Sequence, residues 1–207
     1  MVDISRAKGI DGFMGDQELT WLAEQAQTHH RIVELGSYHG RSTRAMADNT
    51  PGFVVAIDTF YGPKVIAKSP EQRAQNYPTF LFVMDDLLKT GKVRVIKEDH
   101  ATADVDFEPD MVFIDGSHEY QDVKRDILKW YKKLAPDGLM CGMGAKNLEG
   151  VKQAIDETME YKTLGDLWHG KLLCGHDITW LSVLQAVEET LGKRYKVVDG
   201  LDMWVAT

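Results

Sequence analysis

Short apolar runs alternate along the chain with amphipathic or irregular stretches. Each run is four or five residues long, and together they lie at 32–35, 53–57, 93–96 and 111–114. Runs of this length that are rich in Val and Ile favour buried strands over helices. Apolar residues at helical spacing follow the first run, from about Arg41, and the fourth run, over 119–134. This alternation predicts an α/β fold with a mostly parallel, doubly wound sheet.

The C-terminal third contains two similar segments. An apolar run at 139–142 precedes a helical pattern at 150–158, and another at 172–175 precedes one at 183–190. Each segment predicts a strand followed by a helix, and either could supply the fifth strand. The chain closes with apolar runs at 195–198 and 203–206 around Asp199-Gly200, which predict an antiparallel hairpin.

Two segments do not fit the alternation. Residues 1–30 contain an amphipathic pattern from about Gly15 to His30, which predicts a helical lead-in before the first strand. Residues 59–90 have poor periodicity, several prolines and many aromatic residues. A connection this long predicts a substrate-facing lid, and the alternative is a helix over 70–91 that covers the sheet.

Composition narrows the classes of protein and of partner. The 207 residues are 43% hydrophobic and 27% charged, as expected for one globular domain spanning 1–207. The net charge is −8 and no Lys/Arg-rich run occurs, so nucleic acid is not an expected partner. No apolar stretch has the length of a membrane span or a signal peptide, and Cys141 and Cys174 lie in apolar runs. We expect a cytoplasmic protein with buried thiols and no membrane partner.

A glycine turn follows the first strand. Its pattern, Glu34-x-Gly36-x-x-x-Gly40, lies between the strand and the expected helix. A strand end, a tight turn and a helix N-terminus bring unpaired backbone N–H groups together, and small residues let a cofactor approach them. The glycine turn could instead be an ordinary tight connection between a strand and a helix that binds no cofactor. Glu34 could orient a cationic or hydroxyl-bearing ligand.

Polar residues follow the ends of the next strands as well. Asp58 ends the second strand about twenty residues beyond Gly36, a separation at which an acid reaches the ribose hydroxyls of a nucleotide-like ligand. Asp58 could instead cap the N-terminus of a helix or stabilise a turn without binding a ligand. Polar clusters at 97–100 and 115–118 follow the third and fourth strands. Because parallel strands end at one edge of a sheet, these residues predict a ligand site there.

The motifs at 33–37, 40–43, 57–58, 113–120 and 175–177 resemble those of the class I S-adenosylmethionine-dependent methyltransferases. They are most similar to the small-molecule O-methyltransferase branch that includes macrocin-type sugar methyltransferases. The resemblance implies a Rossmann-like, mostly parallel seven-stranded sheet with a C-terminal antiparallel hairpin. It also implies methyl transfer to a hydroxyl of a small molecule such as a sugar or a secondary metabolite.

The resemblance also assigns roles to residues. Asp58 would bind the ribose, Asp99 would lie near the adenine, and His118 beside Asp115 would act as the base, although His118 could instead cap the helix from 119. Asp115 and Asp177 would hold a divalent ion such as Mg²⁺. The full cofactor-binding set that it implies is Glu34, Gly36, Ser37, Gly40, Ser42, Asp58, Asp99 and Asp115.

One departure concerns the metal. In the family, Gly-His-Asp directly follows the fifth strand, but here that slot reads Gly142-Met143-Gly144 and Gly-His-Asp comes at 175–177. The metal site is intact if 143–170 is an insertion, which we favour because 183–190 continues the family pattern. Metal binding is doubtful if 139–142 is the fifth strand.

Two other functions are compatible with such a sheet. A NAD-dependent oxidoreductase is disfavoured by the missing third glycine and by the terminal hairpin. The displaced Gly-His-Asp also leaves a second hypothesis, a methyltransferase-like domain that binds the cofactor without catalysis. The sequence names no acceptor and leaves the oligomeric state open, a homo-oligomer included.

Overall fold

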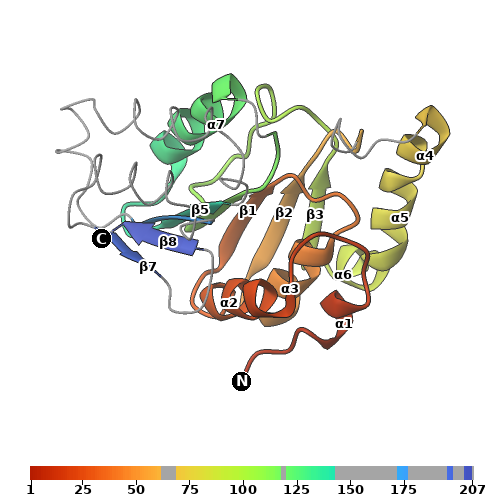
Figure 1. Cartoon of the computed structure of the whole chain (residues 1–207), viewed down its shortest axis with the longest axis horizontal. Helices are drawn as coiled ribbons and strands as arrows, with labels where there is room; N and C mark the ends of the chain where they lie inside the picture. Colours follow the sequence, from red (N-terminus) through yellow and green to blue (C-terminus); the bar gives the residue numbers. More distant parts are fainter. Residues whose placement is uncertain (62–68, 118–119, 143–171, 177–194, 198–202, 207) are drawn as a thin grey trace. The chain divides into compact units, whose positions relative to one another are not determined.

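A computed structural model describes residues 1–61, 69–117, 120–142, 172–176, 195–197 and 203–206 (Figure 1). The chain divides into two compact units, Met1–Asp106 and Phe107–Thr207. The first unit holds the glycine turn and the N-terminal lead-in, and the second holds the strands from the fourth onwards.

The first unit is built on three parallel strands, β1 (Arg31–Leu35), β2 (Phe53–Ile57) and β3 (Val93–Ile96). β2 lies between the other two, with Arg31 opposite Phe53 and Val54 opposite Val93. The last four residues of β1 and of β2 are buried, as expected for parallel strands covered on both faces. The three predicted strands are confirmed within one residue.

The described part of this unit contains six helices (Figure 1). They are α1 (Ser5–Lys8), α2 (Asp16–Ala26), α3 (Arg41–Asn49), α4 (Pro70–Ala74), α5 (Asn76–Val83) and α6 (Asp85–Lys89). α2 packs against α3 through buried residues such as Leu19 and Leu22, and α1 also contacts α3. The expected lead-in helix is therefore present, although it ends at Ala26 rather than near His30.

The segment 69–89 forms three short helices instead of one long helix. Ser69 caps α4 by accepting a hydrogen bond from the N–H of Gln72 (3.3 Å), and Pro70 is the first helical residue. Helix α5 has apolar residues on all of its sides, so that Phe80 is fully buried while Phe82 is 83% exposed. Such a helix has no single apolar face, which explains its poor periodicity. The role of 59–90 as a lid stays a prediction.

The second unit contains β4 (Met111–Ile114), α7 (Tyr120–Lys133), β5 (Leu139–Gly142) and β6 (Leu172–His176). β5 runs parallel to β4, and β6 runs parallel to β5. Both similar segments are therefore strands. The one beside β4 is Leu139–Gly142, which makes it the fifth strand, so the condition under which Met143 and Gly144 occupy the expected metal position is met. Residues 143–171 lie outside the described part, so their status as an insertion stays a prediction.

The C-terminal strands β7 (Tyr195–Val197) and β8 (Met203–Ala206) pair antiparallel, and β8 also pairs antiparallel with β6. The two apolar runs thus form the expected strand pair, although the residues between them lie outside the described part. The described residues contain eight strands, one more than the seven that the resemblance implies. Cys141 is a buried free thiol, as expected. No described helix combines the length and the apolar composition needed to cross a bilayer.

Candidate cofactor-binding site

The glycine turn joins β1 to α3 through left-handed backbone. Gly36 has φ 88°, Tyr38 has φ 47° and Gly40 has φ 93°. Glycine adopts this region without steric cost, whereas a tyrosine there is uncommon. A Cβ added at Gly40 would lie 2.7 Å from Met84 Cε and 3.1 Å from a ring carbon of Phe80. The glycine at 40 is therefore required by its own backbone, and Met84 and Phe80 leave little room for a larger residue.

Asp58 fastens this turn to the end of β2. Its Oδ2 accepts hydrogen bonds from the backbone N–H groups of Ser37 (2.7 Å) and Tyr38 (2.8 Å), and its Oδ1 accepts one from Phe60 (2.6 Å). The N–H of Gly36 donates to the carbonyl of Ile57 (2.9 Å). Each carboxylate oxygen has two lone pairs, so Asp58 retains capacity to accept a bond from a ligand hydroxyl.

Glu34 lies beneath the turn and is fully buried. Its Oε1 accepts a hydrogen bond from Ser42 Oγ (2.5 Å), and its Oε2 accepts bonds from Ser37 Oγ (2.7 Å) and from Thr43 Oγ1. Burial raises the pKa of Glu34 to about 7, and the charge of Asp58 adds to the rise, while the three hydroxyl donors oppose it. All of these contacts are within the protein, so Glu34 and Ser42 position the turn.

The N-terminal lead-in is attached to the first residue of α3. The guanidinium of Arg41 donates to the backbone carbonyls of Lys8 (3.0 Å), Ile10 (2.7 Å) and Met14 (2.9 Å). Sequence reasoning did not identify this role, and the only available signal was an arginine directly after the turn glycine. These bonds hold residues 8–14 against the start of α3, next to the glycine turn.

Tyr38 and His39 connect the turn to two other segments. Their rings stack with centroids 3.7 Å apart. His39 Nδ1 lies 3.2 Å from a carboxylate oxygen of Asp11, and its Nε2 lies 3.1 Å from Asn76 Oδ1 on α5. Nothing in the sequence pattern indicated Asp11 or Asn76 as neighbours of His39.

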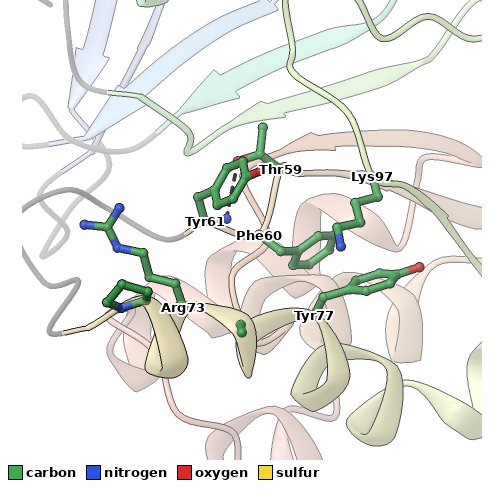
Figure 2. Close-up of a pocket in the computed structure, with 8 residues that line it drawn as sticks. Thr59, Phe60, Tyr61, Arg73, Tyr77 and Lys97 are labelled. Atoms are coloured by element: carbon green, nitrogen blue, oxygen red, sulfur yellow. Dashed lines mark hydrogen bonds between the residues drawn. The ribbon is translucent and has the colours of Figure 1, made fainter.

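A pocket of about 300 Å³ opens beside the turn, and it begins one residue after Asp58 (Figure 2). Its walls come from the segment after β2, from α4 and α5, and from the residue after β3. The lining residues are Thr59, Phe60, Tyr61, Pro70, Arg73, Ala74, Tyr77 and Lys97. The rings of Phe60 and Tyr77 are 4.8 Å apart, and the ammonium of Lys97 lies 4.4 Å from the centroid of Tyr77.

The remaining predicted residues are distributed over both units. Asp99 follows β3 in the first unit, is exposed, and accepts a hydrogen bond from the N–H of Ala101 (2.8 Å). Asp115 follows β4 in the second unit and is half-buried. His118 and Asp177 lie outside the described residues. Within the described ranges, no three His, Cys, Asp or Glu side chains form a group that could hold a metal ion.

Residues 33–142, which run from β1 through β5, match the family model described as a methyltransferase domain. The chain belongs to this methyltransferase family. Family membership implies S-adenosylmethionine as the cofactor. The turn fits that role, because glycine at 36 keeps side-chain bulk away from the strand end and Asp58 can still accept one bond from a ligand hydroxyl.

Solved structures share the fold over nearly the whole chain. A cofactor-bound protein from MTB, Rv0187, has a TM-score of 0.55 at 13% identity, covering 98% of this chain and 86% of its own. A methyltransferase from Geobacter sulfurreducens has a TM-score of 0.54 at 15% identity, with 94% and 79% covered. A SAM-dependent O-methyltransferase from Thermotoga maritima has a TM-score of 0.53 at 13% identity, with 95% and 66% covered. The fold is thus the Rossmann-like methyltransferase fold. No curated protein sequence matches the chain significantly.

Proposed function

We propose that this methyltransferase acts on a hydroxyl oxygen of a small-molecule acceptor. The observation that carries the proposal is the Asp58-fastened glycine turn directly beside the pocket at Thr59–Lys97. When bound, S-adenosylmethionine supplies a methyl group on a sulfonium and leaves as S-adenosylhomocysteine. The fold shared with an O-methyltransferase from Thermotoga maritima supports oxygen as the acceptor atom.

In this proposal the first unit holds the cofactor. Asp58 accepts a hydrogen bond from a ribose hydroxyl through the lone pair that remains on Oδ1, and Asp99 lies near the adenine. Gly36, Ser37 and Gly40 present the backbone of the turn to the methionine portion. The buried carboxylate of Glu34 stabilises the turn, because its hydrogen bonds with Ser37, Ser42 and Thr43 connect the start of the turn to the first residues of α3.

The acceptor hydroxyl must lose its proton as the new carbon–oxygen bond forms. His118 is the proposed base, and Asp115 is its proposed neighbour, because an imidazole titrates near neutral pH. A divalent ion at Asp115 and Asp177 would lower the pKa of the acceptor hydroxyl. The metal stays a proposal that depends on Asp177, which lies outside the described residues, and the position of Leu139–Gly142 as the fifth strand argues against it.

The test is calorimetric titration of the full chain with S-adenosylmethionine and, separately, with NAD. We expect S-adenosylmethionine alone to bind, and we expect Asp58→Ala to weaken that binding by roughly ten-fold or more, because a hydrogen bond to a charged group is lost. Asp85→Ala is the control, since Asp85 is an exposed acid on α6 whose partner is Lys89 (2.6 Å). Circular dichroism checks that each variant is folded.

Binding of NAD in place of S-adenosylmethionine would overturn the proposal and favour the oxidoreductase. Equal affinities of Asp58→Ala and the unaltered protein for S-adenosylmethionine would remove the ribose assignment. Product formation from a panel of hydroxylated acceptors then separates catalysis from cofactor binding without turnover.

A further inference from the structure

The pocket at Thr59–Lys97 has a charge opposite to that of the protein. The chain carries 32 acidic and 24 basic residues, yet the eight lining residues include two cations, Arg73 and Lys97, and no carboxylate. Among the described residues, no carboxylate forms an ion pair with either cation, and the buried Nε of Arg73 has no hydrogen-bond partner. A buried donor without a partner costs free energy, which an anionic ligand would recover.

Three of the other six lining residues are aromatic, namely Phe60, Tyr61 and Tyr77. Figure 2 shows Arg73 and Lys97 on opposite sides of the pocket, with the ring of Phe60 between them. Phe60 is only 3% exposed, whereas Tyr61 is 69% exposed and forms the outer wall. Aromatic walls favour planar apolar groups, and about 300 Å³ is at the small end of ligand pockets. The pocket therefore suits a molecule built on a single ring.

The cofactor does not account for the two cations. S-adenosylmethionine carries a sulfonium and an ammonium against one carboxylate, and its adenine is neutral, so its net charge is positive. Two cations beside it would raise the free energy of binding. An anion on the acceptor would do the opposite, because it would enter a pocket with positive charge on both sides.

Resting on the proposed function, we infer that the acceptor is a small aromatic hydroxy acid whose carboxylate is held by Arg73. The guanidinium of Arg73 offers parallel N–H donors to both oxygens of a carboxylate. Lys97 adds a point charge, and its ammonium already lies over the ring of Tyr77. The ring of the acceptor packs against the aromatic wall.

The experiment is calorimetric titration of the full chain, saturated with S-adenosylhomocysteine so that no turnover occurs. The probes are 4-hydroxybenzoate and its neutral counterpart 4-hydroxybenzamide. We expect the acid to bind at least ten-fold more tightly than the amide. Arg73→Gln should weaken binding of the acid by ten-fold or more and abolish the preference, while the affinity for S-adenosylmethionine stays unchanged.

Arg94→Gln is the matched control, because Arg94 is an arginine of the same unit that lies over the ring of Phe53 (4.0 Å) and does not line the pocket. It should keep the preference for the acid. Equal binding of acid and amide, or no binding of either, would overturn the inference. So would a loss of S-adenosylmethionine affinity in Arg73→Gln, which would assign the pocket to the cofactor. Failure of the proposed function is separate, because it would appear as absent S-adenosylmethionine binding in the unaltered protein.

Discussion

Helix α3 has a carboxylate cluster near each end, and the two clusters use opposite chemistry. Near its start, Glu34 is buried and accepts bonds from neutral hydroxyls only, and its pKa rises to about 7. Near its other end, Asp86 accepts hydrogen bonds from the guanidinium of Arg44, which lowers its pKa to about 2. Neutral donors offset only part of the effect of burial on the pKa of Glu34, whereas a cation stabilises the charged form of Asp86.

The second cluster is a network of two arginines and two aspartates that ties α1, α3 and α6 together. Arg44 lies 3.0 Å from Asp48 and 2.6 Å from Asp86, and Arg6 lies 2.7 Å from Asp48 and 2.9 Å from Asp86. The side chains of Arg44 and Asp48 are each only 4% exposed. The arginine network therefore stabilises packing, while the hydroxyl cluster shapes the glycine turn.

The largest effect is expected from Arg44→Met, which removes the buried cation of the network. Asp48 would stay buried and lose one of its two cations, and breaking a buried pair costs about 3–5 kcal/mol. Urea unfolding measures the loss. Lys89→Met is the control, because Lys89 pairs with Asp85 on the surface and such pairs contribute about 1 kcal/mol or less. Equal losses in the two variants would contradict the difference in burial.

A pH-dependent effect is expected from Glu34→Gln. The folded protein keeps a proton on Glu34 up to about pH 7, whereas the unfolded chain releases it near the model-compound value of 4.5. The stability that Glu34 contributes is therefore complete below pH 4.5 and is lost as the pH rises through 7. Relative to Glu34→Gln, the unaltered protein should lose about 3 kcal/mol between pH 4.5 and pH 8. Urea unfolding at both pH values checks this, and a constant difference would refute it.

The smallest effect is expected from Arg6→Ala. The side chain of Arg6 is 55% exposed, and Arg44 still pairs with both aspartates when Arg6 is removed. The loss should be about 1 kcal/mol or less and should shrink at high salt. Unfolding at low and high ionic strength measures it. A loss as large as that of Arg44→Met would mean that the network acts as one unit.

The strands were predictable because buried parallel strands are continuous apolar runs, and all the predicted runs from 32–35 to 203–206 form strands. Helix α5 could not be predicted from periodicity, because its apolar side chains point in all directions and Phe82 is exposed. Glu34 was expected to face a ligand. Only the fold shows that Ser42 and Thr43, in the first turn of α3, return to its carboxylate. Likewise, the cationic pocket depends on Arg73 and Lys97, which come from distant elements.

The bridge from Asp58 to the glycine turn has a consequence for the speed and strength of ligand binding. Fixing a backbone residue in one conformation costs about 1–2 kcal/mol of entropy at room temperature. Ser37 and Tyr38 are already fixed by Asp58 before any ligand arrives. That entropy is lost during folding instead of during association, so the turn is preorganised and the ligand meets a surface that does not need to be assembled.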